Sequence, residues 1–324
     1  MTIRLNQGNG GKEMNSLIDR LKQHLPASNW THTDNDAAIL KTDIGFFGLT
    51  TDSFVVDPIF FPGGDIGKVA VCGTINDLAM MGVPASALTL GLVIEEGFPE
   101  EDLEKIMISI GFISKKTGIP VVTGDTKVME KGKVDKLIIN TSAVGVTDKV
   151  LDTPLQKGDK IILSGSLGDH AIAVLSQRFE FKTSVVTCCK PLIDEIAAVK
   201  PLIKQAKDPT RGGLASALND IAGRNRCSML LDEEKMPVKK EVRSAVELLG
   251  IDLYSLACEG RFVCFASPEN AHETLEKLKV FNPDTAIIGE VTDTEEEHPE
   301  VVLQTRFGKR LMPMPSGNIV PRIC

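Results

Sequence analysis

The chain has 324 residues, of which 42% are hydrophobic and 25% charged, and its formal net charge at pH 7 is −8. This length favours two domains over one hydrophobic core, and the composition is that of an ordinary globular protein. The longest nearly apolar run, 87–94, is far shorter than the ~20 residues that span a bilayer, and no Lys/Arg block suggests nucleic acid as a partner.

The first half of the chain alternates helical and extended patterns. Short runs of Thr, Phe and Val that end in turn residues are typical of strands, and they are separated by longer helix-like segments. This alternation, with uneven spacing, predicts a mixed α/β domain over residues 1–150. The predicted helices are 15–25, 67–81 and 99–116, and the predicted strands are 45–52, 88–94, 120–123 and 136–146.

A change of composition marks the second half. Residues 147–159 are rich in Asp, Pro, Gly and Lys, which indicates a domain boundary. We expect a second α/β domain over 151–305, followed by a flexible, extended tail over 306–324, where prolines and glycines leave no room for a helix. The helices predicted in this half are 192–205, 214–224 and 239–249, and the strands are 160–164, 261–266 and 286–290.

The beginning of the chain and its cysteines indicate the compartment. The first residues contain neither an apolar stretch nor a small-residue cleavage site, so we expect no signal peptide and a cytoplasmic location. The seven cysteines include no CxxC pair, and we expect most of them to be buried, reduced thiols.

Four aspartates of the first half lie at strand ends or turns, namely Asp36, Asp52, Asp77 and Asp125. If such carboxylates converge in the fold, they repel one another unless a hard cation such as Mg²⁺ bridges them, usually together with substrate phosphates. A magnesium–nucleotide site is therefore one interpretation. The other is that each aspartate caps a helix or a turn.

Three glycine-rich loops precede predicted helices. Backbone N–H groups in such loops bind phosphate oxygens, and the helix dipole adds to the attraction. None of the three is a Walker motif, and glycine before a helix also serves simple turn geometry. The loops are 8–12, with Gly10 and Gly11; 60–68, with Gly64 and Lys68; and 208–213, with Asp208 and Arg211.

Six motifs along the chain are Asp34-Asn-Asp-Ala-Ala, Gly64-Asp-Ile-Gly-Lys, Gly73-Thr-Ile-Asn-Asp-Leu-Ala, Gly124-Asp-Thr-Lys, Asp208-Pro-Thr-Arg-Gly-Gly-Leu and Pro321-Arg-Ile-Cys324. Together they closely resemble the HypE family of hydrogenase maturation factors, essentially over the whole length. The aspartates and glycine loops are shared with the wider superfamily of aminoimidazole ribonucleotide synthetases and selenophosphate synthetases. The ending Pro-Arg-Ile-Cys is specific to the HypE family.

The resemblance implies a synthetase-like fold in which the mixed N-terminal sheet forms the core of a homodimer and ATP binds with Mg²⁺ between the two domains. It makes the four aspartates metal ligands. The partners that it implies are the carbamoyltransferase HypF and the HypC–HypD complex. The cofactor-binding residues that we predict are Gly10, Gly11, Gly64, Lys68, Asn76, Lys127, Asp208 and Arg211.

The activity implied is that of a lyase, the dehydration of a carbamoyl group on the thiol of Cys324 to a thiocyanate, which supplies cyanide for the iron of NiFe hydrogenase. An amide oxygen leaves only after activation, and phosphorylation by ATP supplies it. A base must then take the amide protons, and Glu259 and Lys127 are the candidates. Glu259 has an alternative as the ion-pair partner of Arg261, and His170 is predicted to be a helix-start or core residue outside the site.

Two other functions remain open. The first is an ATP-dependent synthetase that acts on a free small-molecule amide, as aminoimidazole ribonucleotide synthetases do. A selenophosphate synthetase is disfavoured because the first cysteine is Cys72, far from the N-terminal glycine loop. The second is a nucleotide sensor or scaffold without catalysis, which retention of all four aspartates and Lys127 disfavours.

Overall fold

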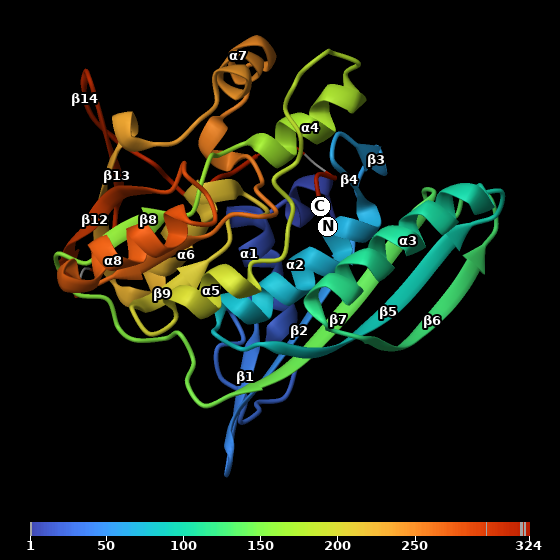
Figure 1. Ribbon diagram of the computed structural model, residues 1–324, viewed down its shortest axis with the longest axis horizontal. Coiled ribbons are helices and arrows are strands. Elements are labelled where there is room, and N and C mark those ends of the chain that lie inside the picture. Colours follow the sequence, from blue (N-terminus) through green and yellow to red (C-terminus); the bar gives the residue numbers. More distant parts are fainter. Residues whose placement is uncertain (1, 296, 318–319, 321) are drawn as a thin grey trace.

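The computed structural model describes residues 2–295, 297–317, 320 and 322–324, and Figure 1 shows its two sheets with helices packed between and around them. The first half forms a five-stranded sheet in the order β1-β2-β7-β5-β6. Only β5 and β6 are parallel, because helix α3 carries the chain back between them. The strands are β1 (Ala38–Thr42), β2 (Gly45–Phe54), β5 (Ala85–Glu95), β6 (Val121–Met129) and β7 (Leu137–Thr147).

Two helices cover one face of this sheet, α2 (Ile66–Met80) and α3 (Glu100–Thr117) (Figure 1). Helix α2 is buried almost all round, since it also packs against the second half. A short hairpin of β3 (Phe60–Phe61) and β4 (Gly64–Asp65) precedes it, and Asp65 caps it by accepting a hydrogen bond from the Lys68 N–H at 2.9 Å. The first described elements are η1 (Leu5–Gly8) and α1 (Lys12–Lys22).

The opposite face of the five-stranded sheet is open in the described chain. Along β5 and β7 buried and half-buried residues alternate, as expected when helices cover one face only. Three large apolar side chains share this open face and are between 37% and 57% exposed, namely Leu49, Met129 and Val146. The edge strand β6 is exposed along its whole length.

The second half forms a seven-stranded sheet in the order β14-β13-β10-β12-β8-β11-β9, in which only β10 and β13 are parallel. Its strands are β8 (Lys160–Leu163), β9 (Ile203–Lys207), β10 (Cys227–Asp232), β11 (Val263–Ala266), β12 (Ala286–Thr294), β13 (Val301–Thr305) and β14 (Gly308–Leu311). The helices are α4 (Asp169–Arg178), α5 (Ile193–Val199), α6 (Gly213–Asn225), α7 (Lys240–Leu249) and α8 (Pro268–Lys279), with 3₁₀ turns η2 (Glu233–Lys235) and η3 (Leu253–Ser255).

Both faces of the seven-stranded sheet are covered around β8 and β11. Leu218 of α6 packs with Phe265 on one face, whereas Leu278 of α8 packs with Cys264 on the other. Strand β11 is accordingly buried at every position. The cluster around α8 also contains Val199 of α5 and Met80 of α2, so one apolar core joins the two halves of the chain.

The predicted mixed α/β architecture is confirmed, with several local differences. The predicted helix 192–205 ends at Val199 and gives way to strand β9, since Pro201 lacks the N–H that a helix needs. The strand predicted at 120–123 continues to Met129, and the predicted tail begins with β14, paired to β13. Pro321 of the predicted tail motif lies outside the described residues. The domain boundary near residue 150 stays a prediction, and none of the helices described has the length and hydropathy for a membrane span.

Candidate active site

A cleft of about 640 Å³ separates the two halves, which is within the usual size of small-molecule sites. Strand β2 and helix α2 form one wall, and helix α6 with the loop before it forms the other. The charged or thiol-bearing residues that line the cleft include Asp36, Asp52, Asp77, Lys207, Asp208, Arg211, Glu259 and Cys324.

Three carboxylates meet in this cleft. Asp36 precedes β1, Asp77 lies on α2 and Asp208 follows β9, yet each offers an oxygen within 4.8 Å of the others. Burial and the neighbouring carboxylates raise the pKa of Asp77 and of Asp208 well above the usual value. Thr50 donates a hydrogen bond to Asp77 Oδ2 at 3.0 Å. Oxygen donors that destabilise one another in this way fit a hard divalent cation such as Mg²⁺.

Two basic side chains lie beside the carboxylates of the cleft. Arg211 is 3.7 Å from Asp52 Oδ1, and Lys207 forms an ion pair with Asp36. Sequence reasoning missed Lys207, although it directly precedes the Asp208 motif, because a lone lysine just after a predicted helix carries no signal. It also assigned Asp208 to the nucleotide rather than to the carboxylate cluster.

Glu259 and Cys324 approach each other at one end of the cleft. Glu259 is 2% exposed, and burial raises its pKa to about 8 although hydrogen bonding with the Cys324 thiol acts in the opposite direction. Burial and Glu259 in turn raise the pKa of the Cys324 thiol well above its usual value. Glu259 Oε1 has no hydrogen-bond partner among the described residues, so this oxygen is available to a proton donor.

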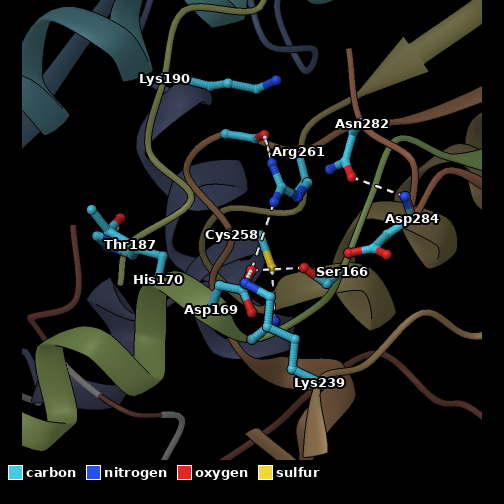
Figure 2. Close-up of polar contacts among 12 residues, drawn as sticks. Ser166, Asp169, His170, Thr187, Lys190, Lys239, Cys258, Arg261, Asn282 and Asp284 are labelled. Atoms are coloured by element: carbon cyan, nitrogen blue, oxygen red, sulfur yellow. Dashed lines mark hydrogen bonds and ion pairs between the residues drawn. The ribbon is translucent and has the colours of Figure 1, made fainter. Parts of the chain in front are cut away.

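The loop that carries Glu259 is held by neighbouring backbone. Cys258 N–H donates to the carbonyl of Pro209 at 2.9 Å, which joins this loop to the Asp208 loop. Arg261 donates to Gly260 O at 2.9 Å and lies 3.6 Å from the buried carboxylate of Asp169 (Figure 2). The alternative in which Arg261 is the ion-pair partner of Glu259 is therefore not what the structure shows.

Asn76 was predicted to bind the cofactor, but its side chain is buried in the core. It is 1% exposed, and its amide nitrogen donates to Lys190 O at 3.1 Å and to Glu259 O at 3.4 Å. Its side-chain oxygen accepts from Leu192 N at 2.8 Å. Because both ends of the amide are used within the chain, Asn76 holds the Glu259 loop rather than a cofactor.

The glycine loops differ in position. Gly10 adopts φ 88°, and a Cβ there would lie 2.8 Å from the backbone carbon of Arg211, so loop 8–12 packs closely on loop 208–213 beside the cleft. Gly11 caps α1 in the same loop. Gly64 lies instead in β4 and Lys68 in the first turn of α2, where Lys68 Nζ donates to Gly63 O at 2.9 Å, and neither residue lines the cleft.

Asp125 and Lys127 also lie apart from the cleft. Both are exposed on β6, by 71% and 66%, and they form an ion pair of 3.2 Å with each other. Strand β6 is three strands away from Asp52 on β2, or roughly 14 Å at about 4.8 Å per strand. Within one chain the structure therefore gathers three of the four predicted metal ligands and leaves out Asp125.

Comparison with known proteins identifies the family. The sequence matches the N-terminal domain model of AIR synthase related proteins over residues 34–147 and the C-terminal domain model over residues 156–302. Carbamoyl dehydratase HypE of Rhizobium leguminosarum bv. viciae is 40% identical over 334 residues, covering 99% of this chain and 95% of the relative. The chain belongs to the HypE family. Carbamoyl dehydratase HypE of Escherichia coli (strain K12) is 37% identical, with 99% of both chains covered.

Solved structures of the HypE family agree with the fold. A crystal structure of HypE in complex with ATP superposes with a TM-score of 0.82 and 37% identity over 100% of both chains. A HypE–HypF complex gives a TM-score of 0.84 and 40% identity, covering 92% of this chain and 99% of the other. The predicted family, its synthetase-like fold and the dehydratase class of enzyme are thereby confirmed.

Proposed function

We propose that this HypE-family chain uses ATP to dehydrate a carbamoyl group on the thiol of Cys324, giving the thiocyanate that hydrogenase maturation uses as a source of cyanide. One observation carries the proposal. The Cys324 thiol lies against Glu259 in a cleft of nucleotide size that also contains the three-carboxylate cluster.

The reaction follows from the chemistry of the group. The carbonyl oxygen of S–C(=O)NH₂ takes the γ-phosphoryl group of ATP, and ADP leaves. Phosphate then leaves with that oxygen, and the nitrogen gives up both protons to leave S–C≡N. Glu259 is placed to accept a proton, since its carboxyl group hydrogen-bonds with the thiol that would carry the amide and its Oε1 has no partner among the described residues. Lys127 remains the second candidate for proton transfer.

The nucleotide phosphates need positive charge. When bound, Mg²⁺ would offset their charge, and Asp36, Asp77 and Asp208 are the residues that fit it, with Asp52 beside them. Arg211 at the cleft wall is the candidate phosphate contact on the protein side. Lys68 stays a prediction for the same role.

A homodimer would account for Asp125 and Lys127, the two predicted site residues that lie outside the cleft of a single chain. By the strand register, Asp125 and Lys127 project from the open face of the five-stranded sheet, together with the apolar Leu49 and Val146. We propose that the open faces of two copies pack together and that each copy supplies Asp125 and Lys127 to the cleft of the other.

Partners follow from the relatives. A relative that is 40% identical in sequence forms a HypE–HypF complex. We propose that HypF also binds this chain and carbamoylates Cys324. The HypC–HypD complex is the proposed acceptor of the cyanide, and the cytoplasm the proposed location.

Mass spectrometry of the intact protein tests the function. After incubation with the carbamoyl donor system, wild type should gain about 43 Da and then lose about 18 Da only when Mg·ATP is present. EDTA should stop the loss but not the gain. Cys324→Ala should show neither change. If an adduct forms and ATP never removes water from it, the proposal is wrong, and an ATP-dependent synthetase acting on a free amide becomes the better reading.

A further inference from the structure

His170 is fully buried next to the chain end, and both of its ring nitrogens are hydrogen-bonded. It is the second residue of α4 and is 0% exposed. Nδ1 lies 2.8 Å from the Thr187 hydroxyl, and Nε2 lies 2.9 Å from the carbonyl oxygen of Ile323, the residue before Cys324. Figure 2 shows His170 and Thr187 side by side. Burial lowers the pKa of His170 to about 4, so the ring is neutral at physiological pH.

The contacts determine which nitrogen carries the proton. A carbonyl oxygen only accepts, so Nε2–H donates to Ile323, and Nδ1 accepts from the Thr187 hydroxyl. Thr187 is itself held, since its oxygen accepts from Cys189 N at 3.0 Å and its N–H donates to Pro62 O at 2.9 Å. With the chain end bound, the imidazole therefore has one tautomer and a fixed direction.

The other end of α4 binds the preceding carbonyl. Arg178, the last residue of the helix, donates to the carbonyl of Arg322 at 2.8 Å and to that of Asp57 at 2.9 Å. Asp57 N–H also donates to Arg322 O, at 3.1 Å. Two consecutive carbonyls next to Cys324 are thus bound by side chains from the two ends of one helix.

We propose that His170 is a positioning residue, which binds the Ile323 carbonyl and so keeps the Cys324 sulfur beside Glu259. Asp169, the residue before His170, supports this role, because it holds Arg261 in the loop that carries Glu259. Adjacent residues of α4 therefore hold the chain segments that carry the two partners of the reaction, and fixed geometry of this kind is worth a large part of a catalytic barrier. His170 touches no reacting atom.

Two substitutions separate positioning from simple core stability. Gln has an amide nitrogen at nearly the position of Nε2, so His170→Gln can still donate to Ile323, whereas His170→Leu fills the space without a donor. The matched control is Thr274→Val in α8, which removes a buried hydroxyl that donates to Asn270 O at 2.8 Å, far from the tail.

The first readout is the alkylation rate of Cys324 by iodoacetamide, followed by peptide mass spectrometry, and it does not rest on the proposed function. His170→Leu should speed alkylation on the order of tenfold, because a released thiol leaves Glu259 and ionises nearer its ordinary pKa of about 8.5. His170→Gln should stay close to wild type, and Thr274→Val should match wild type even where its Tm falls.

The second readout is ATP-dependent loss of water from carbamoylated protein, where His170→Leu should lower kcat on the order of tenfold and leave the KM for ATP unchanged. The proposal is overturned if His170→Leu alkylates at the wild-type rate, if His170→Gln behaves like Leu, or if Thr274→Val accelerates alkylation equally. If wild type and all variants fail to lose water but alkylate in the expected pattern, the proposed function is contradicted. The positioning role of His170 is then still supported, because the alkylation result does not depend on that function.

Discussion

At the scale of single residues, burial gives Glu259 an unusual protonation state. With a pKa of about 8 instead of 4.5, its carboxyl group is mostly protonated at neutral pH, and only the carboxylate can take an amide proton. The rate of water loss from carbamoylated protein should therefore rise as the pH increases above neutral. Single-turnover mass spectrometry across this range measures it, with Cys324 carbamoylated so that its thiol cannot titrate.

Glu259→Gln should lower this rate by about 10² or more and abolish the rise with pH. Glu273→Gln is the matched control, since Glu273 pairs with Lys277 on the exposed side of α8 and should keep the wild-type profile. A rise with pH that survives in Glu259→Gln would assign the base to another group, with Lys127 the first candidate.

Stability changes with pH in the opposite direction. The folded protein binds the Glu259 proton more tightly than the unfolded chain does. The contribution of this proton to the free energy of unfolding is therefore complete below pH 4.5 and is lost as the pH rises through about 8. The pH that favours the base therefore costs stability, which is common at catalytic sites.

At the scale of elements, the cleft depends on how closely two loops pack. Gly10→Ala would bring a Cβ to 2.8 Å from Arg211, whereas Gly97→Ala has a similar φ, 90° against 88°, and no heavy atom within 4 Å. Both substitutions should cost about 1 kcal/mol of unfolding free energy from left-handed backbone. Only Gly10→Ala should also weaken ATP binding, by about tenfold, because loop 208–213 must shift.

Chemical denaturation and calorimetric titration with Mg·ATP measure the two effects separately. Equal ATP affinity in the two glycine variants would show that loop 8–12 does not shape the nucleotide site. Equal loss of affinity would point to global destabilisation.

At the scale of the whole molecule, the open sheet face predicts a shared site. If Lys127 acts in the cleft of the partner, Lys127→Ala and Glu259→Gln homodimers should both be inactive. A mixed dimer then has one cleft with both residues intact. After subunit exchange at equal amounts, about one quarter of the wild-type dehydration rate should return.

Analytical ultracentrifugation of each variant checks that dimers persist, and the separate variants kept unmixed are the control. No recovery after confirmed exchange would place Lys127 in the cleft of its own chain or outside the reaction. A monomer at micromolar concentration would exclude the shared site altogether.

Local sequence signals predicted elements well where the local pattern matches the final environment. Helices α2 and α7 come close to their predicted ranges, because their propensity and periodicity are sufficient. Strands β10 and β13 were not predicted, since they pair with distant segments. Burial alternates along both strands, but half-buried positions such as Leu230 and Val302 are also apolar, which hides the alternation by which strands are recognised. Helix α4 was not among the predicted helices, although His170 was correctly expected at a helix start or in the core.

The sequence by itself determined which chemical groups are available: the aspartates, the glycine loops, Glu259 and the Cys324 thiol, in motifs specific enough to predict the family. Only the tertiary structure decided which of them meet. It placed Asp208 with Asp36 and Asp77, used Asn76 within the core, and bound the chain end to His170, 153 positions away. The physical reason is that charge repulsion, desolvation and hydrogen bonding depend on distance in space, and packing of the two sheets sets that distance.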